Sequence, residues 1–312
     1  MDLFKRPTNI DFIGRRRLAY ALSLLLLIIT VLSLLTRGLN FGIDFTGGTL
    51  VEIAYLHQVE TEDVKRSLAK AGFEGAIVQH FGSSHDVLVR IPSQPEGDKA
   101  GLEQKVMAAL RAAGGTTPEL RRVEYVGPQV GGELVESGGL AILIALGAMV
   151  VYIWLRFERR FALGALAATL HDPIVTFGYF SLFGTEFDMP TLAAILAVIG
   201  YSVNDTIVIF DRIRDNFRKM RKITPIAVIN VSINQTLSRT INTSGTTLLV
   251  VIALLLFGGP LLHGFSLALL VGIIAGTYSS VYVASAAVLD LGVSRADLLP
   301  VKKDDGQPDS QP

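Results

Sequence analysis

The sequence predicts an α-helical polytopic membrane protein with six transmembrane helices and one α+β domain outside the membrane. Half of its 312 residues are hydrophobic, and 18% are charged, below the roughly 25% that is usual for soluble domains. Six apolar runs are close to the length that crosses a hydrocarbon core. A single long polar segment, 36–133, separates the first run from the other five.

Composition also narrows the possible functions. The net charge is zero and the basic residues are spread over the membrane flanks, which argues against a nucleic-acid partner. The chain has no cysteine, which excludes a disulfide framework, a thiol nucleophile and a thiolate metal site. Its His and carboxylate residues do not follow metal-ligand spacing, so we predict no metal and no other cofactor.

The first apolar run, 18–35, reads "LAYALSLLLLIITVLSLL" and contains no charge. At about 1.5 Å of rise per residue it nearly spans a bilayer core. The alternative is a signal peptide, because the preceding segment 1–17 is basic. The following "LLTRGLN" offers no small-x-small cleavage site, which favours a transmembrane helix.

Positive charge orients the remaining spans within 134–289. The basic N-terminus, "RFERR" at 156–160 and the basic loop 211–239 fall on one side, whereas "GTEFDMP" and "FGGPLLHG" on the other side contain no Lys or Arg. This asymmetry predicts that both termini are cytoplasmic and that 36–133 is periplasmic or its equivalent. The five later runs are 138–155, 161–183, 191–210, 243–257 and 265–289.

Two cytoplasmic segments carry weaker signals. The stretch "DRIRDNFRKMRK" in the basic loop is amphipathic, with Ile213, Phe217 and Met220 on one stripe, and we expect it to lie on the anionic leaflet. Contact with a cytoplasmic partner is the alternative. The tail 290–312 is polar and rich in Pro and Asp, which predicts disorder.

The outer segment shows the pattern of a ferredoxin-like βαββαβ domain. Residues 49–54 alternate as a strand, and 61–71 form an amphipathic helix with Thr61 as its cap and Gly72 after its end. A hairpin of 76–81 and 86–91, a helix over 100–113 and a strand over 120–126 follow. That order defines the split βαβ unit.

The glycine-rich stretch at 39–53 connects the first span to this domain. Gly42, Gly47 and Gly48 permit backbone angles that a Cβ would exclude, and Asp44 and Thr46 can bond local amides. From local chemistry a structural turn is favoured over a ligand site, because one carboxylate and one hydroxyl make a poor anion or metal cradle.

The fourth span contains an ionisable residue at depth. Asp205 lies in "GYSVNDTIVIF", with Asn204 beside it and Ser202 one turn earlier, which together predict a polar patch. An intramembrane carboxylate suggests proton transport, and a permanently paired structural aspartate is the alternative. Arg239 opens the fifth span from the same side; snorkelling to the interface is its alternative role. Near it, Thr243 and neighbouring hydroxyls could hold water for proton hopping or pack helices.

The third span contains a second polar pair, His171 and Asp172. Neighbours about 100° apart on a helix are not expected to share one face, but Asp172 can reach Thr169 or Thr176. Pro173 interrupts the helical ladder and frees a carbonyl that His171 or water could satisfy. Asp172 is therefore either a second member of the polar pathway or a structural residue.

Three long blocks resemble one known family. "NFGIDFTGGTLVE" at 40–52, "GYSVNDTIVIFDRIRDNFRK" at 200–219 and the block 234–286, which begins "NQTLSRTINTSG", closely resemble the SecF branch of the bacterial SecD/SecF family. The six-span layout with one external domain after the first span is also that family's. The resemblance covers nearly the whole chain.

The resemblance implies a subunit of the Sec protein translocase, which is not an enzyme and acts with SecD and SecYEG in the bacterial inner membrane. It implies that the proton-motive force drives the export of unfolded polypeptides, that the bundle is half of an RND-type bundle, and that YajC and YidC are further partners. The family pattern places its proton-relay carboxylate at Asp205 and the basic partner at Arg239. The residues of its motif at the base of the domain are Gly42, Asp44, Gly47 and Gly48.

Two other functions remain open at this point. One is half of an RND-type exporter of small molecules or lipids, although such exporters usually join two six-span halves in one chain. The other is a passive scaffold for translocon assembly, in which Asp205 transports nothing.

Overall fold

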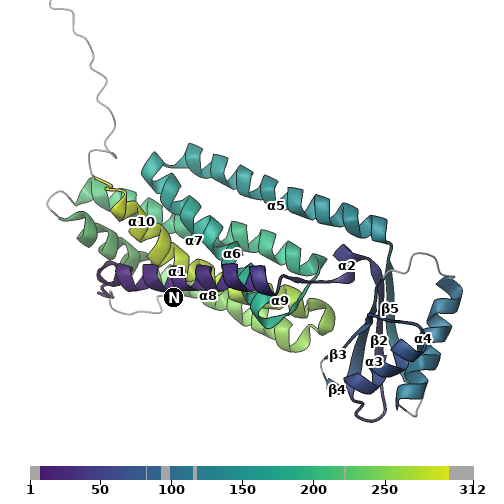
Figure 1. Ribbon diagram of the computed structural model, residues 1–312. Coiled ribbons are helices and arrows are strands. Elements are labelled where there is room, and N and C mark those ends of the chain that lie inside the picture. Colours follow the sequence, from purple (N-terminus) through teal and green to yellow (C-terminus); the bar gives the residue numbers. More distant parts are fainter. Residues whose placement is uncertain (1–7, 82, 93–98, 115–117, 221–222, 295–312) are drawn as a thin grey trace, which may run out of the picture.

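The computed structural model describes residues 8–81, 83–92, 99–114, 118–220 and 223–294 (Figure 1). Part of the basic N-terminus, 1–7, and most of the tail predicted to be disordered, 295–312, lie outside the described residues. A long helical bundle adjoins a smaller domain that contains the main sheet (Figure 1).

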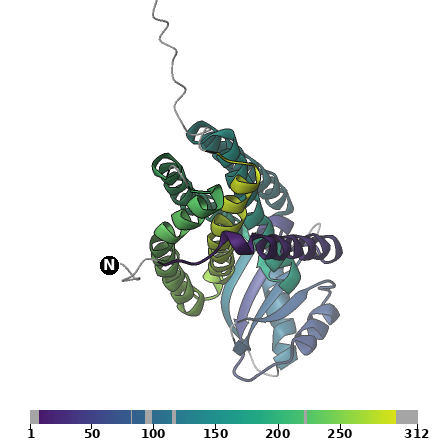
Figure 2. The same cartoon turned by 90° about the vertical axis from the view of Figure 1, so that its left-hand side faces the viewer.

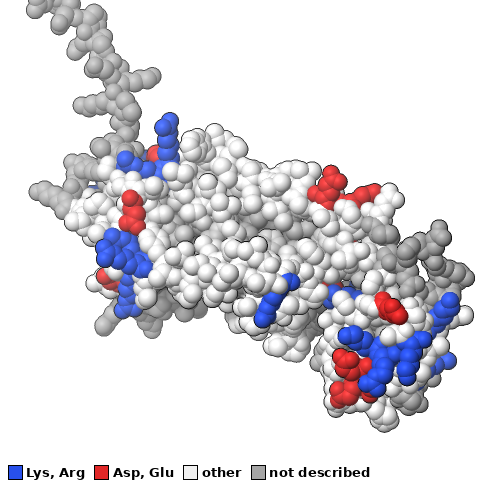
Figure 3. Space-filling model, viewed as in Figure 1, with Lys and Arg blue, Asp and Glu red and all other residues white. Residues whose placement is uncertain are grey.

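Within the described ranges, six helical segments are long and apolar enough to cross a membrane. The sixth is continuous from α9 through a π-helical segment, η2, into α10. Charged residues gather at the ends of the bundle and on the domain, which leaves a broad uncharged band along the visible face (Figure 3). The bounds are α1 Arg16–Thr36, α5 Pro128–Arg156, α6 Arg159–Phe183, α7 Met189–Lys219, α8 Pro225–Phe257, α9 Pro260–Ser279, η2 Ser280–Ala284 and α10 Ser285–Asp290.

The predicted loop 211–239 is mostly helical. Helix α7 runs on to Lys219, and α8 begins at Pro225 after Thr224, whose hydroxyl accepts from the amide of Ala227. The apolar stripe of Ile213 and Phe217 is buried inside the protein, in the core cluster that also contains Val228 of α8. The expectation that this stripe faces the lipid leaflet was therefore wrong. The stripe packs instead against the apolar surface of α8.

Close contacts between helices depend on small residues of α9 and α6. A Cβ on Gly272 would lie 2.3 Å from the side chain of Val198, and one on Gly164 would lie 2.9 Å from the carbonyl oxygen of Ala284. These glycines let α9 approach α7, and α6 approach η2, closely. In the view along the bundle, the yellow C-terminal segment lies between the purple α1 and the green α8 (Figure 2).

The external domain contains a four-stranded antiparallel sheet in the order β3-β4-β2-β5. Helices α3 and α4 bury one face of it, where Ile53, Val87 and Val89 are almost inaccessible. The other face contributes Leu50 and Leu88 to a cavity that also touches the ends of the membrane helices. The bounds are β2 Gly48–Ala54, α3 Thr61–Lys70, β3 Ile77–Phe81, β4 Ser83–Ile91, α4 Lys99–Gly114 and β5 Glu119–Val126.

One detail of the predicted elements was wrong. Thr61 is the first residue of α3 and not its cap; Glu60 occupies the cap position without a side-chain hydrogen bond. The acidic residues Glu62 and Asp63 still lie in the first turn, where they complement the helix dipole.

The junction between domain and bundle contains elements that were not predicted. Strand β1, Asn40–Phe41, pairs in parallel with β6, Glu186–Phe187, from the loop between α6 and α7. A short helix, α2, covers Ile43–Thr46, and α5 begins at Pro128, before the predicted domain boundary at 133. The domain is thus joined to the bundle by backbone pairing as well as by its two chain connections.

We predict that Leu68→Ala destabilises the domain by about 2–5 kcal/mol, because Leu68 is fully buried between α3 and the sheet. Leu56→Ala removes the same atoms from a side chain that is 75% exposed, and should change the free energy of unfolding by less than about 0.5 kcal/mol. Urea-dependent proteolysis of the domain in the full-length protein measures both. Equal urea sensitivity of the two variants would contradict the described core.

Candidate functional site

Asp205 lies where three membrane helices meet. Its carboxylate on α7 is 4% exposed and accepts a long hydrogen bond, 3.4 Å, from Oγ of Ser244 on α8. Oγ of Ser244 is 2.8 Å from Oγ1 of Thr277 on α9, which in turn lies 2.8 Å from the carbonyl oxygen of Ile273. Each hydroxyl has one hydrogen, so this chain can orient its donors toward Asp205 or away from it.

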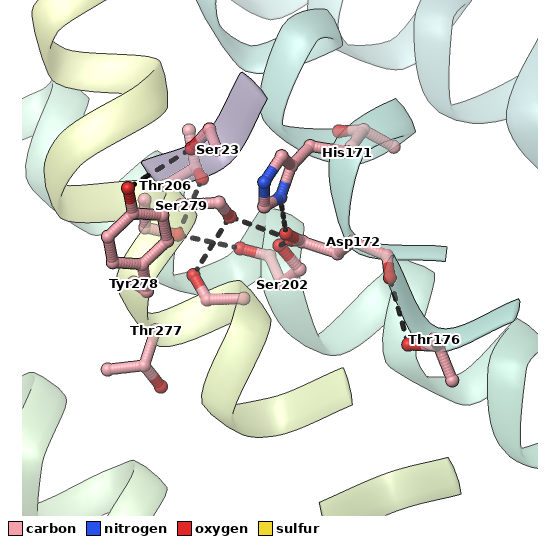
Figure 4. Close-up of polar contacts among 12 residues, drawn as sticks. Ser23, His171, Asp172, Thr176, Ser202, Thr206, Thr277, Tyr278 and Ser279 are labelled. Atoms are coloured by element: carbon pink, nitrogen blue, oxygen red, sulfur yellow. Dashed lines mark hydrogen bonds and ion pairs between the residues drawn. The ribbon is translucent and has the colours of Figure 1, made fainter. Parts of the chain in front are cut away.

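Asp172 lies in a different and more complete polar site. It is inaccessible to solvent, and its carboxylate accepts hydrogen bonds from the hydroxyls of Ser279, at 2.8 Å, and Ser202. Nδ1 of His171 lies 2.9 Å from its other oxygen. Polar side chains from α6, α7 and α9 therefore surround this carboxylate (Figure 4).

The expectations for this pair were wrong in two respects. His171 and Asp172 contact each other although they are adjacent, with Nδ1 of His171 2.9 Å from Oδ1 of Asp172. The hydroxyl of Thr169 donates to the carbonyl of Ala165, and that of Thr176 to the carbonyl of Asp172, so neither reaches the carboxylate. Threonine in a helix often bonds the preceding turn in this way. Helix α6 continues through Pro173.

Hydroxyl groups of α9 and η2 connect the two carboxylate sites to the helices around them. Ser280 begins the π-helical turn, and its Oγ lies 2.8 Å from Oγ1 of Thr206 on α7. Tyr278 donates to the carbonyl of Ala19 at 2.6 Å and lies 3.1 Å from the hydroxyl of Ser23, both on α1 (Figure 4). Sequence reasoning missed this segment, although the hydroxyl-rich "GTYSS" was the available signal. Single π-helical turns occur frequently at functional sites.

The remaining predicted relay residues lie away from the interior. Arg239 and Asn204 are exposed on the surface of this chain. Among the described residues no direct ion pair joins Arg239 to Asp205, but Arg239 lies close enough for its charge to act on that carboxylate. Thr243 is half-buried, and its carbonyl accepts from the hydroxyl of Thr247 at 2.9 Å. Ser202, expected to join Asp205, bonds Asp172 instead. The relay roles of these residues stay predictions.

The glycine motif at the base of the domain combines strained turns with close approach. Gly47 and Gly48 have φ of 68° and 135°, as a turn that excludes Cβ requires. Gly42 has an ordinary φ of −67°, but a Cβ there would lie 2.9 Å from Oε1 of Glu186. A Cβ there would also lie 3.3 Å from Cβ of Asp188 and 3.4 Å from the carbonyl oxygen of Phe187, so Gly42 serves a tight approach to β6 and not a positive φ as predicted.

The polar side chains of this motif also differ from expectation. Asp44 accepts from the backbone amide of Met189, at 2.9 Å and far away in sequence, whereas a local amide was predicted. Thr46 donates to the carbonyl of Gly42 at 3.1 Å. The motif therefore fastens the domain to the start of α7.

The described residues contain no group of three or more His, Cys, Asp or Glu side chains that could hold a metal ion. What the interior offers is two buried carboxylates and a set of hydroxyls, which can accept, hold and pass protons.

Comparison with known proteins places these features in a family. The sequence signature described as "Protein export membrane protein SecD/SecF, C-terminal" matches residues 105–294, and the "SecD/SecF GG Motif" matches residues 32–55. The chain is 50% identical over 299 residues to the protein translocase subunit SecF of Pseudomonas aeruginosa, covering 95% of this chain and 96% of that protein. It is 47% identical to the Vibrio alginolyticus subunit of the same name, covering 100% and 99%.

Two solved structures are also similar. The crystal structure of SecDF from Thermus thermophilus, described as a translocon-associated membrane protein, matches with a TM-score of 0.83 at 38% identity. SecDF in its super-membrane-facing form matches with a TM-score of 0.68 at 39% identity. Each match covers 93% of this chain and 39% of the solved chain, so this chain spans about two fifths of the length of those proteins.

Proposed function

The chain belongs to the SecD/SecF family of protein export membrane proteins, with the SecF subunits of protein translocase as its relatives, and we propose that it couples the proton-motive force to polypeptide export. Like those relatives, it is an accessory subunit and not an enzyme. In this proposal the subunit promotes the movement of the exported polypeptide and does not change it chemically. No cofactor takes part. The proton gradient supplies the energy.

The observation that carries this proposal is that Asp205 is buried and accepts, among the described residues, only one long hydrogen bond. A buried carboxylate in a membrane bundle is costly unless it is paired or protonated, and Asp205 has a single long hydrogen bond. Asp172, by contrast, accepts from two serine hydroxyls and lies 2.9 Å from Nδ1 of His171, and these contacts hold it in place. Asp205 is therefore the group that gains and loses a proton, and Asp172 belongs to the polar pathway that fixes the neighbouring helices.

A second bundle, supplied by SecD, completes the site. Arg239 and Asn204 are exposed on α8 and α7, and α8 also exposes apolar residues such as Ile241 and Leu249. Polar groups that face lipid are costly, so a partner bundle covers this surface and brings Arg239 into a low-dielectric site with Asp205. SecYEG, YajC and YidC are further partners on the basis of the family resemblance.

The finer architecture belongs to the same proposal. The strand order and antiparallel pairing of the domain support a ferredoxin-like unit, and six spans support half of an RND-type bundle. Basic residues at one end of the bundle support an inner-membrane protein with cytoplasmic termini and a periplasmic domain. These basic residues include Arg156, Arg159, Arg160, Arg212, Arg218 and Lys219.

We predict that Asp205→Asn abolishes the export stimulated by a proton gradient while assembly with SecD stays normal. Asparagine keeps the size and hydrogen bonding of the side chain but cannot exchange a proton. Export into inverted membrane vesicles, with and without an imposed gradient, measures the effect, and stimulation should fall to the level without gradient. Asp215→Asn, on an exposed position of the same helix, is the matched control. An Asp205→Asn protein that responds to the gradient as wild type does would favour the scaffold function.

Topology is tested by labelling, which the absence of native cysteine makes simple. We predict that a cysteine at Ser84, on β4, reacts with an impermeant thiol reagent from the periplasmic side of intact cells. A cysteine at Arg218, on the last turns of α7, should react only after the membrane is opened. The reverse pattern would contradict the proposed orientation.

A further inference from the structure

A buried arginine of the external domain contacts the loop before α7 and the β1 strand. Arg90 on β4 is 5% exposed, and its Nη2 lies 2.5 Å from Oε2 of Glu186 in the loop before α7. Its Nη1 also donates to Oδ1 of Asn40 at 3.3 Å and to the carbonyl of Phe41 at 3.5 Å. One guanidinium therefore holds both strands of the β1–β6 ladder from the sheet of the domain.

A second contact joins the domain to the first residue of α7. Asp44 accepts from the amide of Met189, where the helix begins, and Asp188 caps the same terminus by accepting from the amide of Thr191 at 2.8 Å. Free amides and the helix dipole make a helix N-terminus favourable for carboxylates. Asp44 is thus a second cap, contributed by the external domain.

Helix α7 connects this junction to the polar interior. It is continuous from Met189 to Lys219, and Asp205 lies on it, about 24 Å of helix beyond Met189 at about 1.5 Å per residue. Ser202, which bonds Asp172, lies on the same helix. A shift of α7 at Asp205 therefore reaches the junction through an uninterrupted hydrogen-bonded element.

Each of the two chain connections of the domain contains a glycine with open space around it. The incoming connection after α1 contains Gly38, with φ of 69° and no atom within 4 Å of a Cβ built there. The outgoing connection contains Gly127, which is equally uncrowded. The contacts of Arg90 and Asp44 act together with the packing of α2 against α5, where a Cβ on Gly131 would lie 2.9 Å from the carbonyl oxygen of Phe45. They also act together with the stacked rings of Phe45 and Phe187.

We propose that Arg90 and Asp44 are positioning residues that couple the external domain to α7, so that movement of α7 during proton exchange at Asp205 moves the domain. This inference rests on the proposed function for its driving step, but the coupling itself is a property of the junction. Glu186 is the partner of Arg90 in this coupling, and the β1–β6 ladder supplies the backbone contact that the ion pair holds closed.

Burial makes the ion pair sensitive to orientation. Burial raises the pKa of the Glu186 carboxyl, and the charge of Arg90 opposes that rise. Asp188 and Asp44 add negative charge nearby. A buried pair is stable only in good geometry, and loss of one partner leaves a buried charge uncompensated. Within the described residues, Nε and Nη2 of Arg90 have no hydrogen-bond partner, so the guanidinium is held by the ion pair with Glu186 and by the two bonds from Nη1, and a domain in another orientation would lose them.

The test measures orientation and export in the same protein, full-length and assembled with SecD and SecYEG in liposomes. Spin labels on cysteines at Glu62, on α3, and Phe257, at the end of α8, report the distance between domain and bundle; both positions are exposed. Arg90→Gln and Asp44→Asn should each broaden the single narrow distance distribution expected for wild type and abolish gradient-stimulated export. Arg66→Gln, at an exposed arginine paired with Asp63, should change neither.

A cysteine pair separates coupling from folding. Asn40 and Glu186 are directly paired in the β1–β6 ladder, so Asn40→Cys with Glu186→Cys can be bridged by oxidation. The reduced protein lacks the ion pair and should show a broad distribution and no stimulation. Oxidation of the same sample should restore the narrow distribution and the stimulated export.

The outcomes distinguish the coupling from the proposed function. Equal export by the oxidised and reduced forms, or wild-type distances in Arg90→Gln, would overturn the coupling even if Asp205→Asn is inactive. Conversely, an active Asp205→Asn would overturn the proposed function, while the distance distributions would still report whether the junction holds the domain.

Discussion

Burial of carboxylates inside a bundle that lipid surrounds is the constraint on which the rest of this structure depends. The hydrocarbon core offers no water to solvate polar groups, so their partners must come from neighbouring helices. Asp172 obtains three such partners, and the helices that supply them must approach closely. Gly276 permits this approach, since a Cβ there would lie 3.0 Å from the Cβ of Ser202 and 3.4 Å from Asp172 itself.

The two carboxylates differ in how firmly their contacts hold the surrounding helices together. Asp172 joins α6, α7 and α9 through short contacts, and the π-helical turn after Ser279 presents Ser280 to α7 as well. Asp205 has one long contact to Ser244. A change in its charge can therefore alter the packing of α7 against α8 without disturbing the site around Asp172. The external domain, attached at the start of α7, is placed to follow such a change.

The sequence was informative about elements with a local signal and poor at contacts between distant segments. Apolar length identified the six spans, and alternation with glycine punctuation identified every strand of the main sheet. The β1–β6 ladder joins residues about 145 positions apart, which no local pattern encodes. For the same reason Asp44 was assigned to a local turn, although its partner is Met189. Residues 211–239 were predicted to be a loop because they are rich in charge. The helix there is stabilised by packing of Ile213 and Phe217 against another helix, which local sequence does not show.

Within the candidate site, residue type predicted which groups matter and geometry decided their partners. Asp205 and Asp172 were identified because carboxylates are rare at membrane depth. Their partners Ser244, Ser279 and Ser202 depend on how four helices pack, and serine alone is too common in membrane helices to single out. Arg239 was predicted as the partner of Asp205; it is exposed on this chain and acts on Asp205 through its charge and not through a direct ion pair.

Infrared difference spectroscopy of the full-length protein assembled with SecD tests the central claim most directly, because it observes the protonated carboxyl group itself. A pH change should remove or create a carboxyl C=O band that is present in wild type, shifts on deuteration and is missing from Asp205→Asn, while Asp172→Asn retains it. A pH-dependent carboxyl band that is identical in wild type and in Asp205→Asn would show that Asp205 exchanges no proton and would contradict this account.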